Sequence, residues 1–220
     1  MLKNVLEWLQ KRASQPNPTS AIQEKAVRDR GIPDSVISPA IIEPSSTSTR
    51  SAAFTIAMSA DSILRVEEVT DAEFYIGDLF RRRFGADPPT YPRHFVGFYR
   101  PSLNIYHAVG YVHYSPFEDS FLCGGLVIDD RLYRKMPSEH RRHIKGAGGI
   151  AESMLRATFA RLTDAPAIWG YVGNKQSDVV TQRAGFVHTD HRYVMVVWNR
   201  DMPEVERKER LDRVIAIGPF

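Results

Sequence analysis

From residue 62 to residue 198 the chain alternates between two hydrophobic patterns. Short runs rich in aliphatic and aromatic residues are typical of strands, and longer segments with apolar residues at helical spacing are typical of helices. The pattern predicts strands over residues 62–69, 94–100, 105–114, 120–129, 167–172 and 192–198. It predicts helices over 71–85, from 150 onward and over 175–183, and a turn over 115–119. This order indicates a mixed α/β sheet with helices on its faces.

The flanking segments have a different character. The opening residues, MLKNVLEWLQKR, place apolar side chains on one side of a short predicted helix, for which docking on protein is favoured over a membrane surface. Residues 13–51 are rich in Pro, Ser and Thr, which predicts a linker or loosely attached arm. The predicted divisions are an arm over 1–51, a compact domain over 52–200, and a C-terminal segment over 201–220 with a charged helix and a last strand over 215–220.

Composition narrows the class of protein. With 220 residues, 43% hydrophobic and 25% charged, the chain suits one globular domain with extra sequence attached. A net charge of +3 suits an anionic ligand without requiring nucleic acid. The single cysteine, Cys123, excludes an intrachain disulfide and cysteine-rich metal motifs, and it favours a reducing cytoplasm. No apolar run is long enough to span a bilayer, and the start of the chain lacks the pattern of a secretory signal.

One stretch combines a glycine-rich turn with a helix start. In IKGAGGIAESML, residues 144–155, three glycines leave backbone N–H groups free of side chains, immediately before an apolar stripe at helical spacing. Unpaired N–H groups and the helix dipole at the start of a helix favour binding of an anion, and a phosphate group is the expected ligand. The alternative is a turn that only makes a tight corner.

Two motifs together resemble the GNAT superfamily of acyl-CoA-dependent N-acyltransferases. That family's pyrophosphate loop has the form R/Q-x-x-G-x-G/A, which residues 143–148, HIKGAG, match except at His143. Its second signature is an Asn after the fifth strand, Ala or Ser three residues later and a Gly-Phe after the next helix. Asn174, Ser177 and Gly185-Phe186 match it. The resemblance covers roughly residues 62–198 and is carried by both motifs in order.

The resemblance implies a fold, an activity and a cofactor pose. The fold is a mixed, mostly antiparallel sheet with helices on both faces and a splay between strands four and five. The activity is acyl transfer from acetyl-CoA or another acyl-CoA to an amine. Backbone N–H groups of Lys145 to Ile150 would hold the pyrophosphate, and the edge of Val127 to Asp129 would pair with pantetheine. The implied cofactor-binding residues are Val127, Ile128, Asp129, His143, Lys145, Gly146, Ala147, Gly148, Gly149, Ile150, Asn174 and Ser177.

The two motifs do not include the catalytic groups. Many family members have a tyrosine that acts as general acid seven residues after the Asn, where this chain has Thr181. The acid could instead be a nearby tyrosine or solvent, or no acid is needed because the thiolate leaves unassisted. Glu118, Asp119 and His113 are candidate bases. Each has a non-catalytic alternative. Glu118 and Asp119 could simply be turn residues, and His113 could be a partly buried histidine of a strand. For Cys123 a small core residue is favoured over a nucleophile.

Residues 130–143 form a basic insertion that is unusual for the family. It predicts a helical segment, capped by Ser138, that serves as a lid, as a patch for the CoA 3′-phosphate or an acyl carrier protein, or as a solvated surface. His140 and His143 are three residues apart, but no carboxylates accompany them at matching spacing, so a metal site is disfavoured.

Other functional classes stay open. The transferase could use an acyl carrier protein or a long-chain acyl-CoA. A fold that binds CoA or a protein partner without turnover is a rival. Another is a nucleic-acid or membrane adaptor built on the basic insertion and the N-terminal helix. The sequence does not name the acceptor amine, the acyl length or the oligomeric state, a homodimer included.

Overall fold

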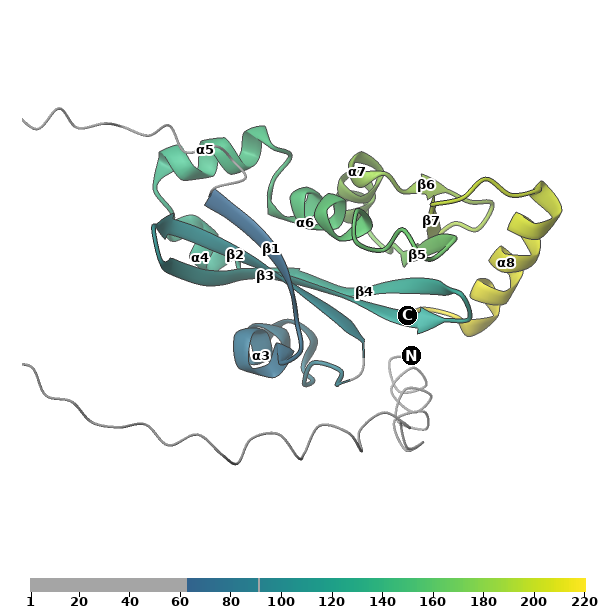
Figure 1. Cartoon of the computed structure of the whole chain (residues 1–220), viewed down its shortest axis with the longest axis horizontal. Coiled ribbons are helices and arrows are strands. Elements are labelled where there is room, and N and C mark those ends of the chain that lie inside the picture. Colours follow the sequence, from purple (N-terminus) through teal and green to yellow (C-terminus); the bar gives the residue numbers. More distant parts are fainter. Residues whose placement is uncertain (1–62, 91) are drawn as a thin grey trace, which may run out of the picture. The chain divides into compact units, whose positions relative to one another are not determined.

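The computed structural model describes residues 63–90 and 92–220. The predicted N-terminal helix, the arm and the start of the compact domain near residue 52 lie outside these residues. The described elements, labelled in Figure 1, are β1 Leu64–Val69, α3 Ala72–Phe84, β2 Arg93–Ser102, β3 Ile105–Phe117, β4 Ser120–Ile128, α4 Asp130–Lys135, α5 Ser138–Gly146, α6 Ile150–Phe159, β5 Ala167–Tyr171, α7 Lys175–Ala184, β6 Val187–His188, β7 Val194–Trp198 and α8 Glu204–Ile217.

Seven strands form one sheet in the order β1-β2-β3-β4-β5-β7-β6. The β4–β5 pair is parallel and the other pairs are antiparallel. The predicted mixed, mostly antiparallel sheet is therefore confirmed, and the fold is GNAT-like. The two-residue strand β6 was not predicted, because it is too short to show a hydrophobic period.

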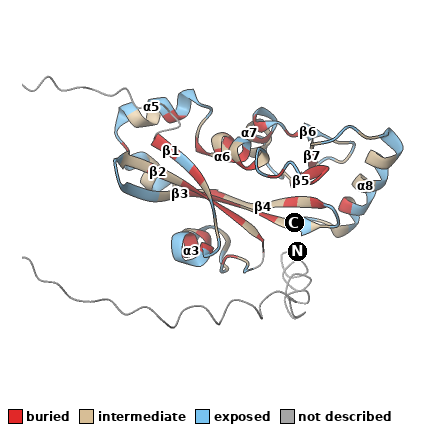
Figure 2. Ribbon diagram, viewed as in Figure 1, coloured by how far each residue is buried: buried red, intermediate tan, exposed pale blue. Residues whose placement is uncertain are grey.

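Helices cover both faces of the sheet. Met154 and Leu155 of α6 belong to the main core with Ile168 of β5. Helix α3 packs on the opposite face, against β2 and β3 (Figures 1 and 2). Trp169, next to Ile168, packs against α8, so α8 lies on the opposite face from α6 because adjacent strand residues point to opposite sides. The splay between β4 and β5 thus lies between helices on either face.

The predicted ends of α3 are confirmed. The side chain of Asp71 accepts a hydrogen bond from the Phe74 N–H at 2.9 Å, and Gly85 ends the helix in the left-handed conformation with φ 70°. Both signals are local. The sequence left Thr70 and Asp71 as alternative caps, and the structure selects Asp71.

Several predicted boundaries are wrong. The expected last strand over 215–220 does not form, because α8 continues to Ile217 and packs its apolar side chains into the core around Trp169. The strand predicted to end at 114 runs on to Phe117, which reduces the turn to Glu118 and Asp119. The insertion is helical, but it forms two helices, and Ser138 is the first residue of α5 with no capping hydrogen bond. Among the described helices, none has the length and apolarity needed to cross a membrane.

Candidate active site

The splay between β4 and β5 originates at a bulge in β4. The two strands pair only over Phe121 to Cys123, opposite Ile168 to Gly170. On its other side, β4 carries one extra residue, because Tyr111 and His113 of β3 lie opposite Val127 and Gly124. Gly125 lies in this bulge with φ 60°, a conformation that favours glycine. Beyond Cys123, β4 therefore continues beside β3 without β5 as a neighbour.

The open edge of β4 is narrower than predicted. The Asp129 N–H donates to the Val109 carbonyl at 2.8 Å, and the Asp129 side chain accepts from the first N–H groups of α4. Val127 lies opposite Tyr111 in the same ladder. Because backbone polar groups alternate in direction along an antiparallel strand, Ile128 directs its N–H and C=O away from β3. Of the three residues expected to pair with pantetheine, only Ile128 offers free backbone groups on that side.

The glycine-rich turn also differs from the expectation. Lys145 and Gly146 lie inside α5, whose N–H groups bond within the helix. The N–H groups of Ala147, Gly148 and Gly149 donate back to His143, Lys145 and Ile144 carbonyls at 2.9–3.1 Å. Of the N–H groups of Lys145 to Ile150, which were predicted to hold a pyrophosphate, those of Lys145 to Gly149 therefore donate to carbonyls of the chain. The N–H groups without an intrahelical acceptor are those of the first turn of α6, starting at Ile150.

A buried carboxylate lies at the same helix start. Glu152 is 7% exposed, and its carboxylate carbon lies 2.4 Å from where a Cβ on Gly148 would be. The Arg156 guanidinium donates to Glu152 Oε1 at 3.0 Å and also to the Arg183 carbonyl on α7. Glu152 therefore lies on the side of α6 that faces α7, folded back over the glycine turn.

The second motif forms a helix cap. Asn174 Oδ1 accepts from the Ser177 N–H at 2.9 Å, and the Asn174 amide donates to Ser177 Oγ at 2.9 Å. Thr181 is buried, and its hydroxyl donates to the Ser177 and Asp178 carbonyls at 3.0 Å. The hydroxyl of Thr181 thus points to its own helix, which excludes it as a proton donor at the splay in this conformation.

Of the three candidate bases, only His113 lies at the splay. Its ring covers two consecutive glycines, since a Cβ on Gly124 or Gly125 would lie 2.8 or 2.5 Å from ring atoms. The residue as a whole is half-buried, and its Nδ1 is buried with no hydrogen-bond partner in the described part of the chain. Burial, and to a smaller extent the charge of His94, lowers the pKa of His113 to about 3. The imidazole is therefore neutral at neutral pH.

Glu118 and Asp119 lie at the other end of β4, in the β3–β4 turn. Arg210 of α8 binds the Asp119 carboxylate through both terminal nitrogens at 2.5 and 2.9 Å, and Arg213 donates to Glu118 at 3.0 Å. Hydrogen bonding to Arg210 lowers the pKa of Asp119. The structure does not bring these carboxylates together with His113, and their contacts give them a role in docking α8.

Tyr171 lies on the other side of the splay. It is the first β5 residue after Gly170, which is paired with Cys123. Since Tyr171 packs with the α8 cluster while Gly124 faces His113, Tyr171 and His113 flank Gly124 on the same face of the sheet. The rings of Tyr193 and Phe220 lie 5.5 and 5.9 Å from the Tyr171 ring, between centroids.

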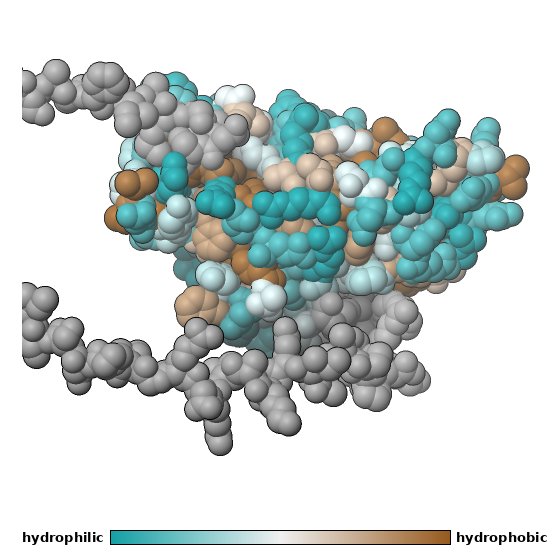
Figure 3. Space-filling model, viewed as in Figure 1, coloured by the Kyte–Doolittle hydropathy of each residue, from teal (hydrophilic) through white to brown (hydrophobic). Residues whose placement is uncertain are grey.

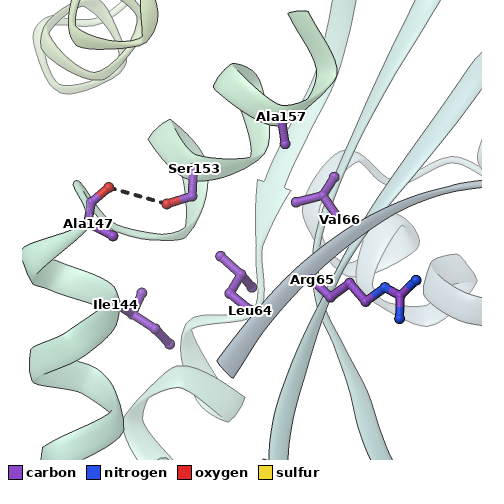
Figure 4. A pocket seen from close by; sticks show the side chains of 7 residues that line it. All are labelled: Leu64, Arg65, Val66, Ile144, Ala147, Ser153 and Ala157. Carbon is purple, nitrogen blue, oxygen red and sulfur yellow. Dashed lines mark hydrogen bonds between the residues drawn. The ribbon is translucent and has the colours of Figure 1, made fainter. Parts of the chain in front are cut away.

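Cys123 and the cavities are less informative. Burial raises the pKa of the Cys123 thiol to about 12, and the side chain packs against the main core. A cavity of about 240 Å³ lies between β1 and the α5–α6 turn, lined by Leu64, Arg65, Val66, Ile144, Ala147, Ser153 and Ala157 (Figure 4). Ser153 of α6 lines this cavity, and its hydroxyl donates to the Ala147 carbonyl at 3.3 Å. Glu152 lies on another side of α6, which faces α7. This cavity is therefore distinct from the splay.

The basic insertion contributes surface charge near the glycine turn. Within it, Arg134 pairs with Asp130, and the Arg141 guanidinium donates to the Arg134 carbonyl at 2.7 Å. His140 Nδ1 and the Tyr99 hydroxyl share a hydrogen bond of 2.7 Å, which joins α5 to β2. His143 Nδ1 contacts the Glu139 carbonyl instead. In residues 63–90 and 92–220 no three His, Cys, Asp or Glu side chains group as metal ligands would.

Sequence reasoning missed three features of this site. The consecutive glycines Gly124 and Gly125 in a strand pattern are a recognised sign of a bulge. The hydrogen bond of 2.7 Å between His94 Nδ1 and the Tyr111 hydroxyl, beside His113, joins residues from two strands. The position of Glu152 has no sequence signal, because an acidic residue in a first helical turn is ordinary.

Comparisons with known proteins add little to this geometry. No family model matches the chain, and no curated protein matches it either. Among solved structures, AtaTR bound with acetyl-CoA is similar at 17% identity and a TM-score of 0.33, over 68% of this chain and 98% of that one. A ribosomal-protein-alanine N-acetyltransferase from Escherichia coli is similar at 11% and 0.38, over 64% and 97%. A GNAT-family acetyltransferase from Staphylococcus aureus is similar at 9% and 0.37, over 62% and 99%.

At these identities and TM-scores the likenesses carry no argument about activity or partners. The fold assignment rests on the strand order and on the short parallel β4–β5 pair.

Proposed function

We propose that this chain is an N-acyltransferase that moves an acetyl or other acyl group from acyl-CoA to a primary amine. The observation that carries the proposal is the splay, where β4 leaves its parallel partner at Cys123 and keeps the Ile128 backbone groups free. The helices α6 and α7 begin at Ile150 and Lys175, directly after the glycine turn and after β5. Their positive N-terminal ends favour an anionic co-substrate.

The reaction needs positioning more than reactive side chains. The amine nitrogen attacks the thioester carbonyl carbon, the C–N bond forms, the C–S bond breaks, and the nitrogen loses a proton while the thiolate gains one. Backbone N–H groups at the open edge of β4 are suited to stabilise the negative charge that develops on the carbonyl oxygen. Holding the two reactants in the correct orientation in the splay supplies the rest of the rate enhancement.

Two side chains are candidates for proton transfer. His113 is the candidate base that lies at the splay, and since its pKa is about 3 it would pass the proton on to solvent. Tyr171, which follows Gly170 directly in β5, is the candidate acid and would take the place of the tyrosine missing at Thr181. Glu118 and Asp119 are weaker candidates because arginines neutralise them.

The variant Ile128→Pro tests the pose because proline removes the backbone N–H from the open edge. We expect isothermal titration of acetyl-CoA to show micromolar binding, about −8 kcal/mol, to the natural chain and at least tenfold weaker binding to Ile128→Pro. Ile128→Val is the matched control, since it keeps the N–H and loses one methylene. Equal affinities of all three proteins, with folding confirmed by thermal unfolding, would contradict the pose.

A module that binds CoA or a protein without turnover is the second candidate. The observation that favours it is the Thr181 hydroxyl, which bonds to its own helix. Binding of acetyl-CoA without release of free thiol, over a screen of primary amines, would support this candidate over the transferase. Release of thiol only with an acyl carrier protein as donor would instead support the carrier-dependent alternative, for which the basic residues of α4 and α5 are the proposed contact.

A further inference from the structure

Glu152 places a negative charge where the proposed co-substrate would bring another. The start of α6 is the only part of the glycine turn whose N–H groups are free of intramolecular backbone acceptors among the described residues. Glu152 is the third residue of that helix, and its carboxylate lies against Gly148, with Oε2 and Oε1 2.6 and 2.7 Å from where a Cβ would be. A carboxylate at this position is stabilised by the helix dipole, as a phosphate would be.

Gly148 and Arg156 hold the carboxylate in this place. Any side chain at residue 148 would occupy the space of the carboxylate, and Gly148 has φ 98°, where side chains are rarely accommodated. Arg156, one helical turn later, donates to Glu152 and to the Arg183 carbonyl of α7. The carboxylate is thus buried against the glycine turn on the side of α6 that faces α7, rather than extended into solvent.

We infer that Glu152 sets the affinity and selectivity for the co-substrate by acting as an internal anion that competes with the pyrophosphate. The inference rests on the proposed function and deepens it. Arg156 pairs with one carboxylate oxygen of Glu152 and offsets part of its charge. A pyrophosphate arriving at the start of α6 would still meet the remaining negative charge at short range, where little water screens it. Binding then requires the carboxylate to swing away with Arg156. Donors without a pyrophosphate do not meet this repulsion.

The test compares two donors that differ in charge. Isothermal titration with acetyl-CoA and with S-acetylpantetheine, which lacks the pyrophosphate, is carried out on the natural chain, Glu152→Gln and Glu139→Gln. Glu139 is an exposed acidic residue in the first turn of α5 and serves as the matched control for net charge. We expect Glu152→Gln to bind acetyl-CoA about tenfold tighter, with S-acetylpantetheine and the Glu139→Gln variant unchanged.

The reciprocal variant sharpens the result. Arg156→Gln leaves the Glu152 charge without its partner, so we expect acetyl-CoA to bind several-fold weaker. Thermal unfolding of each variant separates loss of folding from loss of affinity. Binding of acetyl-CoA by Glu152→Gln alone would also support the inference.

Two outcomes overturn the inference, and they can be told apart. Equal acetyl-CoA affinities of the natural chain and Glu152→Gln would remove the role of Glu152 while the proposed function stands. If neither protein binds acetyl-CoA, the proposed function fails together with the inference. Tighter binding of both donors by Glu152→Gln would show a general effect on the site and would also contradict competition with the pyrophosphate.

Discussion

The two ends of β4 are built in opposite ways. At the turn end, Glu118 and Asp119 are bound by Arg213 and Arg210 of α8, and the following residues pair with both β3 and β5. At the splay end, β4 bulges at Gly125 and loses β5, and the neighbouring His113 of β3 has a buried Nδ1 with no hydrogen-bond partner among the described residues. The difference teaches that the carboxylates before β4 are held by arginines of α8, whereas Gly124 and Gly125 lie where β4 loses β5 and its outer edge stays unpaired.

The largest expected effect comes from closing the bulge with Gly125→Val. A side chain at φ 60° is strained, and the Cβ would lie 2.5 Å from the His113 ring. We expect a loss of about 4 kcal/mol in the free energy of unfolding, measured with urea. Gly146→Ala, at a glycine with open space around it, is the control and should change stability little. A loss below about 1 kcal/mol for Gly125→Val would show that the bulge is not tightly held.

Near neutral pH the effect of His113 is smaller, because it acts only as the solution is acidified. Because its pKa falls from about 6.5 in the unfolded chain to about 3, the unfolded state binds the proton first as the solution is acidified. Stability should therefore be complete above pH 6.5 and fall toward pH 3, by up to about 1.4 kcal/mol per pH unit from this group. His113→Gln should flatten that slope in urea unfolding at a series of pH values. An unchanged slope would mean that the ring is solvated and titrates normally.

The smallest effect is expected at the turn end, with Arg210→Met. The Asp119 partner is 54% exposed, so the ion pair contributes only about 1 kcal/mol after screening by solvent. Since the pKa of Asp119 is lowered, this increment is present above its unfolded pKa of about 3.9 and disappears as pH falls below it. Affinity for acetyl-CoA should be unchanged. Weaker acetyl-CoA binding in Arg210→Met would break the comparison, because it would connect the turn end to the splay.

The sequence by itself determined the features that depend on neighbours in the chain. The order of strands and helices followed from hydrophobic periods, and the helix ends at Asp71 and Gly85 followed from residues within one helical turn. The position of the glycine turn before α6 was also readable, because glycine and the apolar stripe are adjacent. These signals are short-range hydrogen bonds and side-chain periodicities, so they need no knowledge of the fold.

Only the tertiary structure decided which of these groups are available. The glycine-turn N–H groups are used by the end of α5, and Asp119 meets Arg210 across 91 residues. The His113 ring lies on Gly124 and Gly125, and Glu152 lies between α6 and α7. Such contacts depend on how whole elements pack, and no local pattern encodes them. The physical reason is that the same donor or carboxylate can be free or satisfied, and only its distant partners determine which.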